Sequence, residues 1–207
     1  MDNVLDRLDT AVKEYLTSID TDALDDIDHR RLSEILAFTT NLEHAGDIVE
    51  KSLMALAAKR IKRGVSFSEI SRQEIREMMD RLIGNARAAA AVFMTEDPRA
   101  ARQLLGEKEV FREIETRTTD EYFGRARTNR AETIEMGKLL LDIVRDLKRV
   151  NAHLAAAAYP VLEQIAAQKE AADRDRQRQL EWAVVISRST TTRQRLRGRC
   201  DAGTPRG

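Results

Sequence analysis

The stretch that decides the fold is residues 29–63, HRRLSEILAFTTNLEHAGDIVEKSLMALAAKRIKR. Apolar or small residues recur in it every seven positions, in two interleaved rows. The rows are Ile35, Leu42, Val49 and Leu56, and Leu32, Thr39, Gly46 and Leu53. This spacing predicts one long helix with a seam that packs against neighbouring helices. Asp28 is the expected N-cap, and Gly64, after two basic residues, is the expected stop.

The same pattern returns in a second predicted heptad helix, over residues 129–158. Its seam row is Leu140, Leu147, Leu154 and Val161, each 105 residues after its counterpart in the first helix. An offset of whole heptads preserves the apolar face, so we expect two copies of one helical unit lying side by side. Pro160 predicts a kink or an end, because it removes a backbone donor and crowds the preceding turn.

Three further helices are expected, over residues 2–18, 66–94 and 97–127. A capping box from Ser66 to Glu69 predicts the start of the second of these. The pair Asp97-Pro98 predicts the start of the third, because proline suits the first helical position.

The end of the chain changes in composition from about residue 169, where Arg, Gln and Thr become frequent. We expect a short helix near residues 174–186 and otherwise a disordered tail. The alternative is a basic patch for an anionic surface, because four arginines lie between residues 193 and 199.

These elements predict an all-α antiparallel bundle of two related units. We place the first unit at residues 1–64, the second at 65–168, and a basic, largely disordered tail at 169–207. The composition agrees, since 42% of the 207 residues are hydrophobic, 34% are charged, and only 9 are Gly and 3 are Pro.

Charge and composition exclude several classes of protein. Basic and acidic residues balance at 35 each, whereas a nucleic-acid-binding protein normally carries a basic surplus. Cys200 is the single cysteine, so an internal disulfide is excluded and an inert thiol is expected. The apolar runs fall short of the roughly 20 residues that span a bilayer, and no signal-peptide pattern precedes them. We therefore expect a cytoplasmic, non-membrane-spanning chain, free or at the inner face of the membrane.

Three carboxylates, Glu43, Asp47 and Glu50, lie along one side of the first heptad helix. Carboxylates in such a row repel one another unless a metal ion or basic side chains neutralise their charge. The alternative is a solvated acidic stripe, which is favoured by its position about 100° from the seam unless a further helix covers it. His44, beside Glu43, is expected to be exposed. The sequence contains no Glu-x-x-His, His-Glu-x-x-His, Gly-x-Ser-x-Gly or phosphate-binding glycine loop, so we expect no enzyme.

A second polar cluster, Asp146, Lys148, Arg149 and Asn151, lies on the second heptad helix. One interpretation is a contact with an anion or a protein partner. The other is a salt-bridged helix face in which Asn151, at a seam position, sets the register or pairs with another buried polar group.

The segment Asn41-Leu-Glu-His-Ala-Gly-Asp-Ile-Val-Glu50 resembles the PhoU motif, a Glu-x-x-x-Asp within a long helix of a three-helix unit used twice. Residues 146–154 and 158–162 resemble the second-repeat helix of a narrower group, and residues 57–68 its linker. That group is the PhoU-like domain at the C-terminus of bacterial Na/Pi-cotransporter II-related proteins, which are sodium-dependent phosphate transporters. The resemblance covers about residues 1–166.

The resemblance implies a cytosolic regulatory or accessory domain of phosphate transport that acts through protein contacts. Its partner would be a membrane phosphate transporter domain or another component of phosphate uptake. The first unit would be truncated at its N-terminus, leaving part of its seam to be covered by a homodimer or by a membrane partner. The alternatives are a metal-binding helical-bundle protein and a purely structural interaction module. We expect phosphate itself not to bind tightly.

The resemblance also implies iron or zinc at the first Glu-x-x-x-Asp motif, on Glu43 and Asp47. In the second copy Lys148 and Ala152 replace these two residues, so we expect the second metal site to be lost. Family members use further acidic residues on a neighbouring helix. The candidates here are Asp2 and Asp6 in the first unit, and Glu107 and Glu109 in the second.

Overall fold

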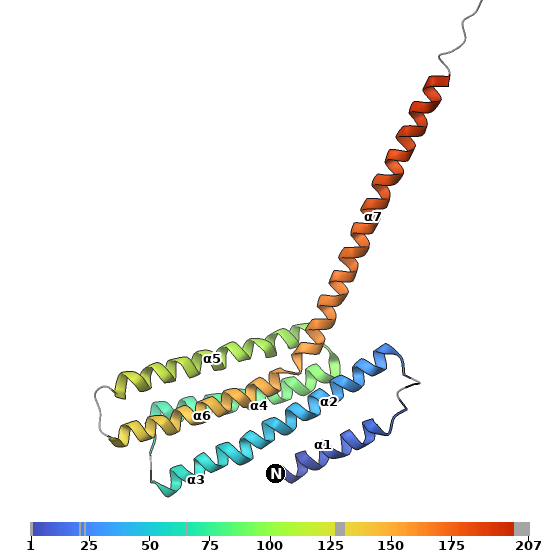
Figure 1. The fold of residues 1–207 in the computed structure, drawn as a ribbon. Coiled ribbons are helices and arrows are strands. Elements are labelled where there is room, and N and C mark those ends of the chain that lie inside the picture. Colours follow the sequence, from blue (N-terminus) through green and yellow to red (C-terminus); the bar gives the residue numbers. More distant parts are fainter. Residues whose placement is uncertain (1, 21, 23, 65, 127–130, 201–207) are drawn as a thin grey trace, which may run out of the picture. The chain divides into compact units, whose positions relative to one another are not determined.

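The structure is a computed structural model that describes residues 2–20, 22, 24–64, 66–126 and 131–200. Its described elements are all helical, which confirms the all-α prediction (Figure 1). The elements are α1 (Asp2–Thr17), α2 (Asp26–Asp47), the π-helix η2 (Ile48–Leu53), α3 (Met54–Lys62), α4 (Glu69–Thr95), α5 (Pro98–Ala126), α6 (Ala131–Ala155) and α7 (Ala158–Cys200). Residues 1–162 form one compact unit and residues 163–207 another.

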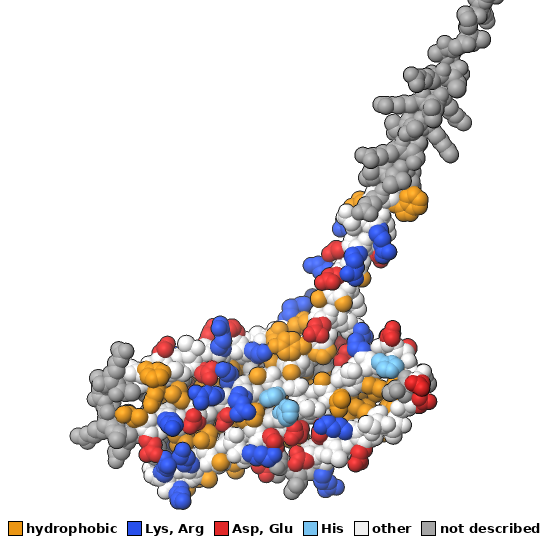
Figure 2. All heavy atoms as spheres, viewed as in Figure 1, with side chains coloured by type: hydrophobic (Ala, Val, Ile, Leu, Met, Phe, Trp, Pro, Cys, Tyr) orange, Lys and Arg blue, Asp and Glu red, His pale blue; other side chains and the backbone are white. Residues whose placement is uncertain are grey.

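Helix α6 is the centre of the first compact unit. It packs against α2, η2, α3, α4 and α5, and the ribbon shows these helices lying roughly along one another (Figure 1). Its heptad positions Leu140, Leu147 and Leu154 are buried as predicted, and Val161, the next member of the row, is buried at the start of α7. Figure 2 shows acidic and basic side chains interspersed with apolar patches on the face of the bundle in view.

The first heptad helix departs from its predicted seam. Segments α2, η2 and α3 follow one another without a break, but Val49 is 43% exposed. The buried apolar residues in the described part of this helix are Ala45 and Ile48. The heptad prediction fails here because the π-turn widens the helix, as the Met54 N–H bond to the Val49 carbonyl shows. Leu53 and Leu56, the later members of the two rows, are half-buried.

Two predicted caps were misplaced. Asp25, not Asp28, caps α2, and its carboxylate accepts from the N–H groups of Ile27 and Asp28, both at 2.8 Å. Ser68, not Ser66, caps α4, and its hydroxyl accepts from the Ser71 N–H at 3.1 Å. Burial of Phe67 holds the chain in the core just before this cap, so the helix starts later than the capping box predicts.

Two other boundaries agree with the sequence. Asp97 accepts from the Arg99 N–H at 2.9 Å at the start of α5, and Gly64 has a φ of 61° at the end of α3. The break near Pro160 is also confirmed, because α6 ends at Ala155 and α7 begins at Ala158. Pro160 falls in the first turn of α7, where its missing N–H costs no helical bond.

The disordered tail predicted from residue 169 is wrong for the residues described there. Helix α7 continues to Cys200; residues 201–207, and the side chain of Cys200, lie outside what the structure describes. The segment between Val161 and Arg197 contains no Gly or Pro and is rich in strong helix formers. Ion pairs one turn apart support it, as between Glu170 and Arg174 at 3.9 Å. The side chains of the arginines at 193–199 are likewise not described, so the basic-patch alternative stays a prediction.

The two predicted units share one compact body. Two helical stretches, α1 and α2–α3, precede Gly64, and three helices, α4 to α6, follow it.

Within the described part of the chain, no helix combines the length and the apolar character that crossing a bilayer requires.

Candidate metal centre

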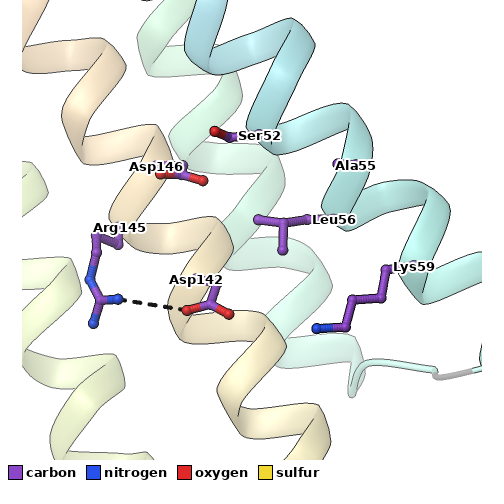
Figure 3. A pocket seen from close by; sticks show the side chains of 7 residues that line it. All are labelled: Ser52, Ala55, Leu56, Lys59, Asp142, Arg145 and Asp146. Carbon is purple, nitrogen blue, oxygen red and sulfur yellow. Dashed lines mark ion pairs between the residues drawn. The ribbon is translucent and has the colours of Figure 1, made fainter.

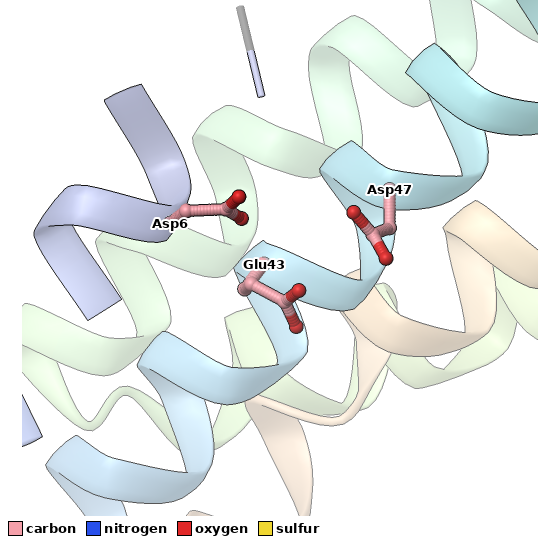
Figure 4. Close-up of side chains that lie close together, drawn as sticks. All are labelled: Asp6, Glu43 and Asp47. Atoms are coloured by element: carbon pink, nitrogen blue, oxygen red, sulfur yellow. The ribbon is translucent and has the colours of Figure 1, made fainter. Parts of the chain in front are cut away.

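Three carboxylates from two helices converge in the first half of the bundle. Asp6 lies on α1, and Glu43 and Asp47 lie one turn apart on α2. One oxygen atom of each lies within 4.8 Å of the others, and the side chains turn toward the same gap (Figure 4). All three are half-buried, so they are partly shielded from the water that would screen their mutual repulsion.

Gly46 allows the two helices to approach this closely. A Cβ added at this position would lie 2.4 Å from Leu5 Cδ1, so a larger residue would push Leu5 aside. Leu5 directly precedes Asp6, and Gly46 directly precedes Asp47. The small residue therefore helps to bring the α1 carboxylate to the motif on α2.

Two described side chains that can carry positive charge lie beside the cluster. Lys51 Nζ lies 2.5 Å from Asp47 Oδ1, one turn further along the chain. His44 Nε2 lies 3.5 Å from Glu43 Oε2 and contributes a charge only when the ring is protonated. Among the ion pairs of the described residues, one lysine and one histidine face the three carboxylates, and a divalent cation would add positive charge here.

Glu50, the third residue of the predicted stripe, does not belong to the converging group. It lies in η2 and is exposed. The π-turn that begins at Ile48 changes the helical phase after Asp47. The three-residue spacing from Asp47 to Glu50, which would place both on one face of a regular helix, therefore does not place them together here. Asp6, which the PhoU resemblance suggested, takes the third place, and the side chain of Asp2 is not described.

The donor set fits a single divalent cation. Carboxylate oxygens bind such ions at about 2.0–2.6 Å, so two donors on one ion lie no more than about 5 Å apart. The observed 4.8 Å limit meets this condition. Oxygen donors suit hard ions such as Mn²⁺ or Mg²⁺, and a nearby imidazole such as His44 also makes Fe²⁺ and Zn²⁺ candidates.

This chain is similar to proteins that are named for inorganic phosphate export. It is 34% identical to the "Putative inorganic phosphate export protein YjbB" of Salmonella typhimurium over 155 residues, which are 75% of this chain and 28% of that protein. Its identity to the protein of the same name from Escherichia coli K12 is 32%, over the same shares of the two chains. The chain thus spans less than a third of the length of these relatives. No protein-family model matches it. No solved structure matches it.

The second predicted cluster does not form one site, because its members face different neighbours. Lys148 pairs with Glu115 on α5, and Arg149 pairs with Asp146 at 3.0 Å. Asn151 is completely buried and accepts a hydrogen bond from Asn85 Nδ2 on α4 at 2.8 Å. Asn151 therefore follows the alternative interpretation, pairing with another buried polar group.

Asp146 also lines a pocket of about 330 Å³ between η2, α3 and α6. Figure 3 shows its polar walls, with Ser52 and Lys59 on one side and Asp142, Arg145 and Asp146 on the other. Arg145 is paired with Asp142 at 3.6 Å. Two basic and two acidic side chains line this pocket, so its lining has no net positive charge that would attract an anion. The predicted anion contact therefore stays a prediction.

The remaining acidic candidates on α5 are each engaged with arginine. Glu107 pairs with Arg81 at 3.1 Å, and Glu109 pairs with Arg112 at 2.5 Å. The sequence missed the partners Glu115 and Asn85, because no local spacing links residues on separate helices.

Two histidines meet where α2 faces α6. The rings of His44 and His153 lie edge to face with centroids 5.3 Å apart. His153 Nδ1 lies 2.9 Å from the amide oxygen of Asn41. Burial lowers the pKa of His153 below its ordinary value, and His44 and then Arg149 lower it further by repulsion.

Acidification should therefore destabilise the bundle through His153. The unfolded chain takes up a proton below about pH 6.5, whereas the folded protein resists it because its pKa is lower. The stability contributed by the neutral ring is complete above the unfolded pKa and is lost as pH falls through the folded pKa. Urea unfolding from pH 8 to pH 5 should show a smaller pH dependence in His153→Gln than in the wild type. The exposed His29→Gln is the control, and equal slopes in all three proteins would contradict the assignment.

Proposed function

We propose that this chain is a PhoU-like, non-catalytic accessory domain that regulates phosphate transport by contacting a membrane transporter. The observation that carries the proposal is the convergence of Asp6, Glu43 and Asp47 on a motif that resembles the PhoU motif. The similarity to phosphate export proteins supports it independently. Because the chain matches 28% of those relatives, we propose that it acts as one part of a phosphate-moving machinery.

In this proposal the three carboxylates hold a divalent cation. The ion would supply positive charge between α1 and α2, and no chemical step is assigned to it. Asp6 would contribute from α1, while Glu43 and Asp47 would contribute from α2. Binding would therefore hold α1 against α2, and loss of the ion would leave three carboxylates repelling one another. A change in the position of α1 is the signal that a transporter could sense.

A chimaera tests the regulatory role. The region of the Salmonella protein that matches this chain is replaced by the matching part of this chain, and phosphate efflux is measured in cells at low and high phosphate. A functional chimaera should keep the response to phosphate supply. The same chimaera carrying Glu43→Gln and Asp47→Asn should export phosphate without that response. A response unchanged by these substitutions would favour a purely structural module.

A partner surface is proposed on the outer side of α1. Val4, Leu8 and Tyr15 are 68%, 52% and 70% exposed, and their spacing places them along one stripe of the helix. Ala11 is exposed between them. An apolar stripe of this kind is the feature that a second copy of the chain or a transporter surface would cover.

Light scattering after size-exclusion chromatography distinguishes these partners. If a second copy covers the stripe, the mass should approach that of a dimer as concentration rises, and Leu8→Glu with Tyr15→Glu should return it to a monomer. Thr10→Glu, on an exposed position of the same helix, is the control. A monomer at every concentration would contradict dimerisation and leave the transporter as the proposed partner.

A further inference from the structure

We propose that Lys148 is a tethered cation, which does in the second half of the bundle what a bound divalent ion does in the first. Only the first half would then respond to the ion. This inference rests on the cation site proposed at Asp6, Glu43 and Asp47.

The backbone supports the 105-residue register between the halves. Segment η2 spans Ile48–Leu53, and adding 105 gives residues 153–158. There α6 ends, and the N–H groups of Ala156 and Ala157 bond to carbonyls three residues earlier at 3.2 and 3.3 Å. One copy thus has a widened π-turn and the other a tightened turn at the same place. The α-helix is interrupted at equivalent positions, which a chance match of heptads does not require.

The interface between the halves agrees with this register. Ala45 on α2 and its counterpart Val150 on α6 are both buried. His153, the counterpart of buried Ile48, contacts Asn41 and His44 across the interface. The helices α2 and α6 therefore face each other through equivalent positions. This arrangement places Glu43 and Lys148 at corresponding sites, each on the side that faces its own neighbour.

Those neighbouring helices correspond as well, and Glu115 lies about one helical turn beyond Phe111, the residue that the 105-residue offset pairs with Asp6. Helix α1 packs on α2, and α5 packs on α6. Asp6 of α1 lies close to Glu43, and Glu115 of α5 pairs with Lys148. The side chains of Lys148 and Glu115 are 35% and 23% exposed, which is close to the 22% of Glu43 and the 29% of Asp47. An acidic residue from the neighbouring helix is thus met by a lysine in one half and by two carboxylates in the other.

The charge differs accordingly between the two places. The first half presents three carboxylates with Lys51 beside them, whereas the second presents one carboxylate neutralised by one lysine. Ala152 stands where Asp47 stands in the first half and offers no donor. The second half therefore has its positive charge built into the chain and needs no ion to hold α5 against α6.

The distribution of the core fits this division of roles. The helices α4, α5 and α6 supply most of the buried apolar side chains, including Met78, Phe111 and Val144, each fully buried. The described part of α2, η2 and α3 supplies Ala45 and Ile48. A half with little core depends more on an added interaction, so the ion is expected to act on the less stable half.

The test introduces the missing donors into the second half of the full chain. Lys148→Glu with Ala152→Asp should raise bound Mn²⁺ from one to two per chain in equilibrium dialysis with plasma mass spectrometry. It should also enlarge the rise in melting temperature on adding Mn²⁺. Lys148→Met is the matched control, which should keep one Mn²⁺ and melt lower than wild type with or without the ion. A double variant with native circular dichroism that binds only one Mn²⁺ would overturn the inference.

The reverse substitution, a lysine at position 43 of the first half, tests the same inference if the Lys148→Glu/Ala152→Asp variant does not fold. Glu43→Lys should abolish Mn²⁺ binding and should melt higher than the metal-free wild type, because it places a lysine beside Asp6. A lower melting temperature than that of the metal-free wild type would overturn the inference. If the wild type binds no Mn²⁺ but the double variant binds one, the proposed cation site fails while the role of Lys148 stands.

Discussion

The Glu43→Gln/Asp47→Asn variant is expected to lose all stoichiometric divalent metal while keeping its helical content. Replacing two of the three carboxylates by neutral amides removes two negative charges, and one carboxylate with two weak amide oxygens does not retain an ion in competition with water. At an ion concentration about 100 times its Kd, binding stabilises the folded protein by about 2.7 kcal/mol. For a chain of this size that corresponds to roughly 5–10 °C in Tm, a shift that the variant should lack.

The measurement is metal analysis by plasma mass spectrometry on both proteins, followed by melting curves with and without Mn²⁺, Fe²⁺ and Zn²⁺. Glu50→Gln is the matched control, because Glu50 is acidic, close in sequence and outside the converging group. It should bind and respond as the wild type does. Equal metal content in the wild type and the double variant, or none in either, would show that the carboxylates are a solvated acidic group.

The second large effect is expected at the buried pair of Asn85 and Asn151. Asn85 Nδ2 donates to Asn151 Oδ1 at 2.8 Å, and Asn151 is fully buried. Asn151→Leu should destabilise the bundle by about 1–3 kcal/mol, because it leaves the buried amide of Asn85 without this partner. Asn85→Leu/Asn151→Leu should recover much of that loss, because replacing both partners removes the unsatisfied groups together. Among the described residues Asn151 Nδ2 has no hydrogen-bond partner, so its removal adds to the recovery.

Urea unfolding of the two single variants and the double variant gives the coupling free energy directly. Gln103→Leu, on an exposed position of α5, is the control and should change stability by no more than about 0.5 kcal/mol. If the double variant loses the sum of the two single losses, the pair is not coupled, and its role in setting the register of α4 against α6 is wrong.

The second heptad helix shows how much of the structure the sequence could predict. Its apolar row predicted both the helix and the buried positions Leu140, Leu147 and Leu154, because a side chain's place on a helix follows from the period alone. The first heptad helix was predicted with similar spacing, yet Val49 is exposed. Sequence spacing assumes a regular helix, and nothing local in the segment indicated the π-turn at Ile48–Leu53.

The prediction of a disordered tail from residue 169 failed for a different reason. Its low apolar content and many charges favoured disorder, but α7 runs to Cys200. Local propensity and ion pairs such as Glu170 with Arg174 support the helix over residues 169–180, where the side chains are exposed. A polar composition therefore argues against a packed core more strongly than it argues against a helix.

By itself, the sequence determined that the described part of this protein is all-helical, the approximate bounds of the helices before residue 156, and that Glu43 and Asp47 share one helix face. These properties depend on residues a few positions apart, which local geometry links directly. Only the tertiary structure decided that Asp6 rather than Glu50 completes the carboxylate group, that Asn151 meets Asn85, and that Lys148 meets Glu115. Those contacts join separate helices, and their geometry depends on how closely and in what register the helices pack.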